Sequence, residues 1–393
     1  MDSRTGLPVV GMVGGGQLAR MTHQAAISLG QSLRVLAADE NDAAGLVASQ
    51  VTIGHHTDLE ALRTFASEVD VLTFDHEHVP GEHLLTLSME GFVLRPGVES
   101  LPFAQNKLVM RERLSAHGFP CPPFAEVSEV DDVLKFAATH SWPVVLKTAR
   151  GGYDGRGVWM LGSDAEAREV VPELLAGGAE LLVEQRVRMR RELAALVARS
   201  PFGQGAAWPV VETVQEGGIN TEVLAPAPGL TSRQVHEAQE LALRIAAELK
   251  VAGVLAVELF DTDGGLVVNE LAMRPHNSGH WTMDGAQTSQ FEQHLRAVLD
   301  YPLGATSLRA PTVMANVLGA PEKPAMGPDE RLHHLFARFP DVRVHMYGKG
   351  ERPGRKLGHV NVVGSDMGEL RTRAKLAAHW LSHGEWLDGH QIH

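Results

Sequence analysis

The sequence predicts a three-part protein of mixed α/β and α+β class, and three observations support this. A strand–helix–strand pattern opens the chain, a glycine-rich loop and two strand pairs follow, and prolines punctuate the stretch after Pro302. At roughly 150 residues per domain, a chain of 393 residues has two or three domains. We expect an open parallel α/β domain over residues 1–104, a central domain over 105–310 with a loop-bearing lobe at about 122–190, and a small β-rich module over 311–393.

The first domain is predicted from alternating strand and helix signals. Residues 9–13 are a short β-branched run that three glycines follow. Apolar residues then recur at helical spacing, at Leu18, Met21, Ala25 and Leu29. Apolar runs at residues 33–37 and 69–74 predict two further strands. Strand, helix and strand in close succession indicate a βαβ unit, and hence a parallel sheet with covered faces.

The central and terminal regions combine helices with antiparallel strands. In chain order, we predict a helix and four strands, at residues 106–117, 144–147, 158–161, 181–185 and 193–199. The strands on either side of the glycine-rich loop 151–157 are predicted to form a hairpin. An amphipathic helix over 235–249 leads into strands 253–260 and 266–271, whose connecting turn predicts an antiparallel pair. The terminal module is predicted to hold strands 342–347 and 360–363 and a final helix over 367–383.

Composition excludes several classes of function. Basic residues number 35 and acidic residues 48, so the net charge is −13, which repels nucleic acid and anionic membranes. The single cysteine, Cys121, excludes a disulfide framework and a multi-cysteine zinc site. No apolar run approaches the roughly 18 residues that span a bilayer, and the first ten residues lack a signal peptide's apolar core. We expect a cytoplasmic protein that binds neither nucleic acid nor membrane.

A first candidate site is the glycine run Gly14-Gly15-Gly16-Gln17-Leu18-Ala19, between a predicted strand and helix. Glycines at this point let backbone amides at a helix N-terminus approach a phosphate. With Asp39-Glu40 after the next strand, the pattern also fits a dinucleotide fingerprint. A phosphate-bearing substrate, a dinucleotide and a purely structural turn all stay open here.

A second candidate is Lys147 with the loop of residues 151–157, which we call the flap. Four glycines in this loop allow its amides to cover a polyphosphate, and the upstream lysine supplies a point charge. No Gly-Lys-Ser/Thr ends the loop, so it is not a P-loop. A plain hairpin loop would explain the glycines but not Tyr153, Asp154 and Arg156 among them.

Two further candidates lie close together in the sequence. Glu258 and Asn269-Glu270 occupy the predicted strand pair, where carboxylates in apolar surroundings suit Mg²⁺ that holds phosphates. The donor-rich segment 273–280 follows directly, and its Arg274 suits bicarbonate or a transferring phosphate. Solvent-facing acids and a polar surface turn are the alternatives. Residues 75–78 are predicted to be a substrate-contacting loop at a strand's carboxyl end.

Together these segments resemble the ATP-grasp enzymes, and among them the 5-(carboxyamino)imidazole ribonucleotide synthase family of purine biosynthesis. The similar segments are, in chain order, residues 13–21, the flap, residues 269–282 and residues 355–359. The resemblance implies an ATP-grasp fold with an N-terminal pre-ATP-grasp domain and a small C-terminal module. It also implies a ligase that uses ATP and bicarbonate to carboxylate the exocyclic amine of 5-aminoimidazole ribonucleotide through carboxyphosphate, with Mg²⁺ as cofactor, in a homodimer.

The resemblance also implies roles for individual residues. ATP would contact Lys107, Lys147, Gly152, Tyr153, Asp154, Gly155, Arg156, Gly157, Val158, Glu184, Gln185, Arg186, Val187, Glu192, Gln215, Asn269 and Glu270. Glu258 and Glu270 would hold Mg²⁺. The catalytic residues would be Tyr153, Asp154, Arg156, Arg274, His276 and Lys356. The aminoimidazole ribonucleotide would contact Gly16, Gln17, Leu18, Glu77, Asn277, Ser278, Arg355 and Lys356.

Some positions depart from the family pattern. Lys107 stands where arginine is usual, and Asp75, Gln215, Met273 and Trp281 replace a common glutamate, histidine, proline and tyrosine. The roles of Asp75 and Gln215 are therefore open. Two other functions are kept as alternatives. Another ATP-grasp ligase, such as formate-dependent glycinamide ribonucleotide transformylase, would differ at the acceptor site, and a Rossmann dehydrogenase would explain only the first segment.

Overall fold

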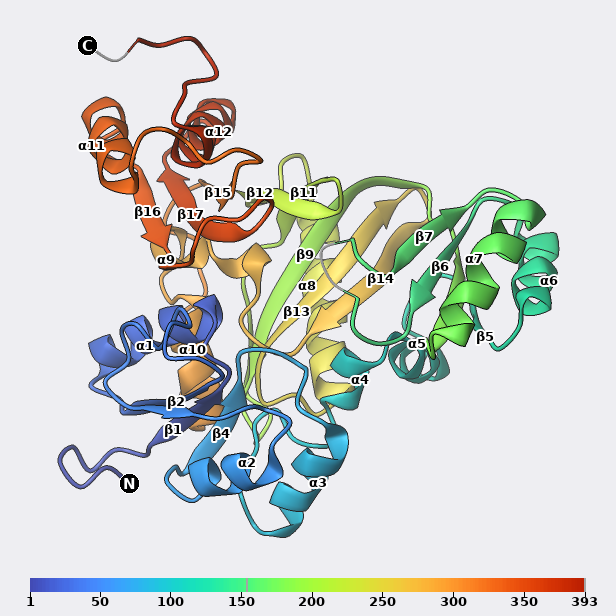
Figure 1. Cartoon of the computed structure of the whole chain (residues 1–393), viewed down its shortest axis with the longest axis horizontal. Coiled ribbons are helices and arrows are strands. Elements are labelled where there is room, and N and C mark those ends of the chain that lie inside the picture. The colour runs from blue at the N-terminus through green and yellow to red at the C-terminus, as the bar shows by residue number, and fades with distance from the viewer. Residues whose placement is uncertain (153–154, 392–393) are drawn as a thin grey trace.

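The computed structural model describes residues 1–152 and 155–391, and its strands form three sheets (Figure 1). A four-stranded sheet belongs to the N-terminal part, another four-stranded sheet forms a projecting lobe, and a nine-stranded sheet runs between them and the C-terminus. Among the described residues, no helix has both the length and the apolar character needed to cross a membrane.

The N-terminal sheet is parallel, as the sequence predicts. Its strands are β1 (Val10–Val13), β2 (Leu33–Ala37), β3 (Val51–Ile53) and β4 (Val71–Phe74), in the spatial order β3-β2-β1-β4. The helices here are α1 (Gln17–Leu29), α2 (Leu59–Ala66), α3 (Gly81–Met89) and α4 (Pro102–Gln105). The predicted βαβ unit is confirmed, and the carboxyl ends of β1 and β4 bring the glycine run and residues 75–78 to one edge.

The projecting lobe is a four-stranded antiparallel sheet with two helices. Its strands are β5 (Phe124–Val127), β6 (Val144–Thr148), β7 (Val158–Leu161) and β8 (Leu181–Gln185), in the order β5-β8-β6-β7. Its helices are α6 (Val130–His140) and α7 (Asp164–Ala176). The predicted hairpin is confirmed, because β6 and β7 pair antiparallel with Lys147 opposite Val158. The flap therefore joins two strands that end at the same edge of the lobe.

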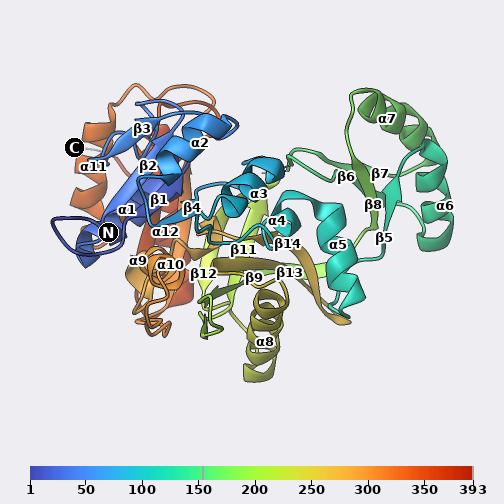
Figure 2. The same cartoon turned by 90° about the horizontal axis from the view of Figure 1, so that it is seen from below.

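Helix α5 (Lys107–Ala116) lies at the junction between this lobe and the large sheet. Figures 1 and 2 both show it between the lobe and strand β14. Asn106 caps the helix, since its side chain accepts hydrogen bonds from the amides of Leu108 and Val109 at 2.9 and 3.2 Å. The same helix thus reaches both sides of the space between the lobe and the large sheet.

The large sheet contains nine strands from the middle and the end of the chain. They are β9 (Met189–Arg199), β10 (Gly205–Ala207), β11 (Val211–Glu216), β12 (Ile219–Ala225), β13 (Gly253–Thr262), β14 (Gly265–Ala272), β15 (Thr312–Leu318), β16 (Arg343–Met346) and β17 (Lys356–Val363). The helices are α8 (Ser232–Glu248), α9 (Thr282–Gly285), α10 (Gln290–Val298), α11 (Pro328–Arg338) and α12 (Met367–His383). The predicted β13–β14 pair is antiparallel, and Glu258 lies opposite Glu270.

The C-terminal strands continue the large sheet. β15 pairs with β12, β17 pairs with β15, and β16 forms the edge. Helix α12 covers these strands, and Trp380, Leu224 and Val360 belong to one buried cluster. The sequence predicts β16, β17 and the final helix of this module, but it misses β15, which pairs with β12 and so joins the module to the large sheet.

Candidate active site

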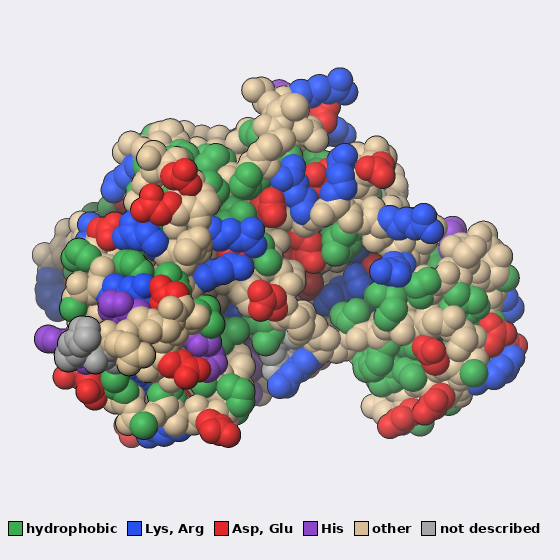
Figure 3. All heavy atoms as spheres, turned by 90° about the horizontal axis from the view of Figure 1, so that it is seen from above, with side chains coloured by type: hydrophobic (Ala, Val, Ile, Leu, Met, Phe, Trp, Pro, Cys, Tyr) green, Lys and Arg blue, Asp and Glu red, His purple; other side chains and the backbone are tan. Residues whose placement is uncertain are grey.

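A cleft of about 1190 Å³ separates the projecting lobe from the rest of the molecule. Figure 3 shows this hollow, in which acidic and basic side chains lie side by side. The cleft brings together most of the residues that the resemblance singles out, from all three parts of the chain. These are Gln17, Leu18, Glu77, Lys107, Lys147, Gly152, Gly155, Val158, Glu184, Gln185, Arg186, Val187, Glu192, Gln215, Glu258, Asn269, Glu270, Arg274, His276, Asn277 and Lys356.

Among the described residues, some of the predicted site residues do not line the cleft. Tyr153 and Asp154 lie outside the described residues. The amide of Gly16 is turned inward to Asp75, and Ser278 is fully buried with its hydroxyl on the His276 ring at 2.8 Å. Arg355 instead donates to the carbonyl of Gly350 at 3.2 Å. The residues that the structure does not place on the cleft wall are thus Gly16, Arg156, Gly157, Ser278 and Arg355.

The two carboxylates of the predicted metal site face each other across β13 and β14. Glu258 lies opposite Glu270 in the register, and the Asn269 amide donates to Glu258 Oε2 at 3.3 Å. Burial, the facing Glu270 and the nearby Glu192 raise the pKa of Glu258 to about 8. Lys107 Nζ lies 3.1 Å from Glu270 Oε1. Carboxylates whose charges repel in a cleft are a suitable pair of ligands for a divalent cation.

These two carboxylates need other ligands to complete a metal site. Within the described part of the chain, no group of three or more His, Cys, Asp or Glu side chains is arranged to hold a metal ion. Mg²⁺ in nucleotide sites commonly takes one or two carboxylates together with substrate phosphates. Glu258 and Glu270 therefore fit Mg²⁺ that arrives with a nucleotide.

Asp75 stands where the family commonly has a glutamate, and in this structure it holds the glycine run in place. Its carboxylate accepts hydrogen bonds from the amides of Gly16 and Ala19 at 2.6 and 3.1 Å. A Cβ on Gly16 would lie 2.3 Å from Asp75 Oδ2, so a glycine is required there. Burial raises the pKa of Asp75. Because a carboxylate already occupies these amides at the start of α1, the run does not present them to a dinucleotide.

Arg274 and His276 lie where the large sheet meets the N-terminal domain. Arg274 donates to Glu77 at 2.8 Å, which joins the segment after β14 to the loop after β4. Burial and the charge of Arg274 lower the pKa of His276 to about 3, so its ring is neutral at pH 7. His276 Nε2 lies 3.5 Å from Glu258 Oε1. An arginine and a neutral imidazole therefore border the carboxylate pair.

Several polar residues of the site were not predicted from the sequence. Lys349 donates to Gln17, and the Asn277 side chain accepts from Asn220 and Asn316 at 3.0 and 2.8 Å. Lys349, Asn220 and Asn316 are thus the residues that the prediction lacks. Gln215, which was predicted, hydrogen-bonds to Glu192, whose pKa burial raises. Sheet pairing and chain crossings bring these residues together, so a local motif could not reveal them. Arg111 was also not predicted, but the sequence did hold a signal for it: Arg111 lies four residues after Lys107, which places both on one face of α5.

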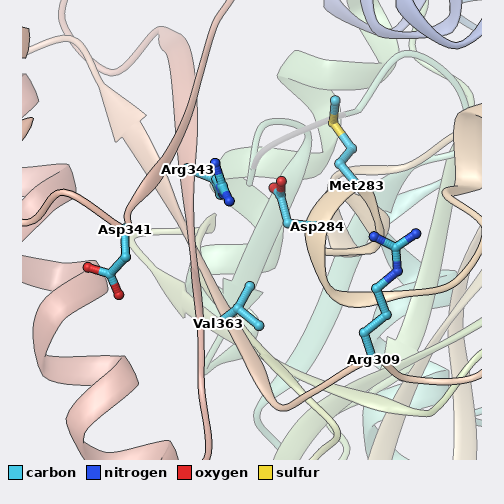
Figure 4. Close-up of a pocket in the computed structure, with 6 residues that line it drawn as sticks. All are labelled: Met283, Asp284, Arg309, Asp341, Arg343 and Val363. Atoms are coloured by element: carbon cyan, nitrogen blue, oxygen red, sulfur yellow. The ribbon is translucent and has the colours of Figure 1, made fainter. Parts of the chain in front are cut away.

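A second, smaller cavity of about 310 Å³ lies beside α9 and the end of β17 (Figure 4). Its lining residues are Met283, Asp284, Arg309, Asp341, Arg343 and Val363, none of which is a predicted site residue. Asp284 accepts hydrogen bonds from His345 at 2.8 Å and from Asn361 at 2.7 Å. These bonds tie α9 to β16 and β17, which indicates a structural role for Asp284.

Comparison with known proteins connects this site to a family. Residues 112–291 match the ATP-grasp domain, residues 7–105 the ribonucleotide synthetase preATP-grasp domain, and residues 312–373 the phosphoribosylaminoimidazole carboxylase C-terminal domain. An N5-carboxyaminoimidazole ribonucleotide synthase of Mycobacterium bovis is 63% identical over 388 residues, which cover 98% of this chain and 90% of that protein. The chain belongs to the N5-carboxyaminoimidazole ribonucleotide synthase family. The resemblance inferred from the motifs is confirmed, and the dehydrogenase alternative is wrong.

Solved structures of the same family share the whole fold. The synthetase from Thermus thermophilus is 36% identical, with a TM-score of 0.85 over 96% of this chain and 99% of that one. An Aspergillus clavatus synthase in complex with ADP and 5-aminoimidazole ribonucleotide is 32% identical, with a TM-score of 0.85 over 95% and 98% of the two chains. The predicted ATP-grasp fold, with its pre-ATP-grasp domain and C-terminal module, is therefore confirmed. The family's members are ATP-dependent ligases of purine biosynthesis.

Proposed function

We propose that this chain carboxylates the exocyclic amine of 5-aminoimidazole ribonucleotide, with ATP and bicarbonate as the other substrates. The products are 5-carboxyaminoimidazole ribonucleotide, ADP and phosphate. One observation carries the proposal: a single cleft collects the carboxylate pair, the flap, Arg274 and His276, the Gln17 loop and Lys356. The first two suit a metal-bound nucleotide, and the others suit an anionic acceptor and a second anion between them.

ATP would lie between the projecting lobe and the edge of the large sheet. The segment Glu184–Val187 follows β8 and would contact adenine, while Glu192 on β9 would accept from the ribose hydroxyls. Lys147 and Lys107 would neutralise phosphate charge, and the flap would close over the phosphates. Burial raises the pKa of Glu192. Hydrogen bonds from the ribose hydroxyls would offset this effect, because they favour the charged carboxylate.

Mg²⁺ would be held by Glu258 and Glu270 and by phosphate oxygens. When bound, it would supply positive charge to the phosphates during transfer. The chain's own part is to orient these carboxylates: Asn269 bonds Glu258, and Lys107 pairs with Glu270. Because the pKa of Glu258 is raised to about 8, its proton would compete with the metal at neutral pH and below, and metal binding would displace it.

Bicarbonate would lie between Arg274, His276 and Lys356, and would attack the γ-phosphate in line. Arg274 is fixed by Glu77, so its remaining donors can point at the oxyanion. Because carboxyphosphate hydrolyses in water, the flap must close before transfer and stay closed until the amine attacks. Tyr153, Asp154 and Arg156 are proposed to act from the flap on the reacting groups.

The remaining assignments concern the domain boundaries, the cellular location and the oligomeric state. We propose domain boundaries at residues 104 and 310, a cytoplasmic location and a homodimer. The location rests on the single cysteine, and the homodimer rests on the family resemblance. Sedimentation of the purified chain would test the dimer, with a monomer at micromolar concentration as the opposing result.

The function is tested by ADP release with ATP and bicarbonate, measured with and without 5-aminoimidazole ribonucleotide. The proposal predicts strong stimulation by that nucleotide and a requirement for bicarbonate. The other ATP-grasp chemistry is tested in the same assay by glycinamide ribonucleotide with formate. Stimulation by that pair and none by the aminoimidazole would overturn the assignment.

A further inference from the structure

Arg111 on α5 is a buried cation that does not line the cleft, yet its guanidinium binds both walls of it. Nε donates to Glu184 Oε1 at 2.6 Å, Nη1 to the carbonyl of Val268 at 3.1 Å, and Nη2 to the carbonyl of Asn269 at 2.7 Å. Glu184 lies next to the last residue of the lobe strand β8, whereas Val268 and Asn269 lie on β14 of the large sheet. One planar group therefore connects the two elements on either side of the nucleotide cleft.

Glu184 passes this contact on to Lys147. The carboxylate lies 2.7 Å from Lys147 Nζ through its second oxygen, so it bridges two cations. The side chains of Arg111 and Glu184 are only 1% and 3% exposed. Burial would raise the pKa of Glu184, but Lys147 and Arg111 beside it hold that pKa below its ordinary value. The carboxylate is therefore charged, and it has a cation on each side.

The contacts of Lys147 continue to β14, the strand that carries Glu270. Lys147 Nζ also donates to Asn269 Oδ1 at 3.4 Å, and Asn269 precedes Glu270. One helical turn before Arg111, Lys107 pairs with Glu270 at 3.1 Å. Both cations of α5 thus act on the strand that carries Glu270, one through its backbone carbonyls and one through the carboxylate.

We propose that Arg111 is a positioning residue for the nucleotide: it holds Glu184 so that Lys147 points at the phosphates, and it fixes β14 relative to the lobe. The proposal rests on the proposed role of Lys147 in ATP binding. A lysine would keep the charge but not the fork, because Nε, Nη1 and Nη2 of the guanidinium each donate to a different acceptor and a lysine has one nitrogen. Arg111 itself does not touch the nucleotide, so its effect must pass through Lys147.

A double-mutant cycle tests this route. The affinity for a non-hydrolysable ATP analogue with Mg²⁺ is measured in the full-length chain and in Arg111→Lys, Lys147→Met and the double variant. We expect Arg111→Lys to weaken binding about tenfold with Lys147 present and less than about twofold in Lys147→Met. A purely structural arginine would weaken binding by the same factor in both backgrounds, and that result would overturn the proposal.

Two further comparisons keep the test decisive. Glu184→Gln, which is isosteric, should show the same loss of effect in Lys147→Met, and it replaces Arg111→Lys if that variant does not fold. Arg331→Lys is the matched control, because Arg331 is also buried and bonds Leu381 and Glu351 away from the cleft. It should lower the melting temperature and leave the analogue's affinity unchanged.

The same data separate this inference from the proposed function. If Lys147→Met binds the analogue as the parent does, the assignment of Lys147 is wrong and the proposal is overturned with it. If the parent releases ADP in response to 5-aminoimidazole ribonucleotide but the cycle is additive, the function stands and the role of Arg111 is overturned.

Discussion

Negative charge is concentrated at one point of the cleft, where Glu258 and Glu270 face each other and Glu192 lies close by. In the absence of a metal ion, burial and repulsion from the neighbouring carboxylates raise the pKa of Glu258 to about 8. Lys107, Arg274 and Lys356 stand around this point as partners for the anions that would arrive with the metal. The balance of charge at this point therefore depends on a few side chains, and it would change when Mg²⁺ and the substrates bind.

Replacing Glu270 with glutamine tests this balance. Glu270→Gln keeps the shape of the side chain but removes one charge, so we expect turnover to fall on the order of 100-fold at low Mg²⁺. The melting temperature of the metal-free chain should change little. ADP release is measured against Mg²⁺ concentration, with Glu248→Gln, whose parent residue pairs with Arg113 away from the cleft, as control. Normal activity of Glu270→Gln at low Mg²⁺ would show that the carboxylate holds no metal.

His294 gives a prediction for stability against pH. Its Nδ1 accepts from the amide of Val254 at 3.1 Å, its Nε2 bonds Thr73 at 2.7 Å, and burial lowers its pKa to about 3. The unfolded chain binds a proton at this histidine below about pH 6.5, whereas the folded chain does not. Stability from this group is therefore complete above that pH and is lost as the pH falls.

The expected slope is measured by urea unfolding between pH 7 and pH 5 in EDTA. The parent should lose up to about 1.4 kcal/mol of unfolding free energy per pH unit through this one group. His294→Asn should be less stable at pH 7 but should show a shallower pH dependence by that amount. Equal slopes in the two proteins would mean that His294 is protonated in the folded state.

At the scale of elements, strand and helix predictions succeeded where the signal was local. β2, β7, β8 and α12 have the predicted bounds, and both predicted antiparallel pairs are present. β3 was missed because it is three residues long and only partly buried, so it carries no clear alternation. For the glycine run the sequence left a phosphate-bearing substrate, a dinucleotide and a structural turn open. The structure shows the Gly16 amide on Asp75, a partner 59 residues away that no local pattern reveals, while Gln17 and Leu18 line the cleft.

The flap is the element whose closure the proposed mechanism requires. Gly155 has a φ of +77°, and a Cβ there would lie 3.2 Å from the Cα of Gly218 in the turn between β11 and β12. Gly155→Val should therefore obstruct the flap's contact with the large sheet. Because carboxyphosphate would then meet water, we expect ADP to form in excess of carbamate.

The stoichiometry of ADP to carbamate distinguishes uncoupling from slow turnover. Gly178→Val is the matched control, since Gly178 has a φ of +79° with nothing within 4 Å of a Cβ. It introduces the same backbone strain, and its ratio should stay at that of the parent. A slow Gly155→Val enzyme that still makes one carbamate per ADP would show that flap closure does not protect the intermediate.

At the scale of the whole molecule, one sheet links the nucleotide site to the C-terminus. β13 and β14 carry the carboxylates, and the same sheet continues through β12 and β15 to β17, which begins at Lys356. The positive charge of Lys356 acts on both Glu258 and His276, which places it at the carboxylate pair. The sequence predicts Lys356 as a site residue through a family motif, whereas its position in the cleft follows from pairing between residues up to 93 positions apart in the chain, such as Glu222 with Ala315.

Lys356→Met tests whether the C-terminal strands serve the acceptor. We expect the KM for 5-aminoimidazole ribonucleotide to rise about tenfold or more, because a charge-assisted contact is lost, while the affinity for ATP changes little. Both constants are measured side by side, with the exposed Lys323→Met as control. A loss of ATP affinity with an unchanged acceptor KM would assign Lys356 to the nucleotide.

In the proposed mechanism, ATP phosphorylates bicarbonate in this cleft before the amine attacks. Freshly prepared 18O-labelled bicarbonate, with ATP, Mg²⁺ and 5-aminoimidazole ribonucleotide, tests this in a single turnover. Since the bond between carbon and the bridging oxygen breaks when carboxyphosphate transfers its carboxyl group, we expect one labelled oxygen in the phosphate that is released. Phosphate without label, formed alongside the carbamate, would contradict it.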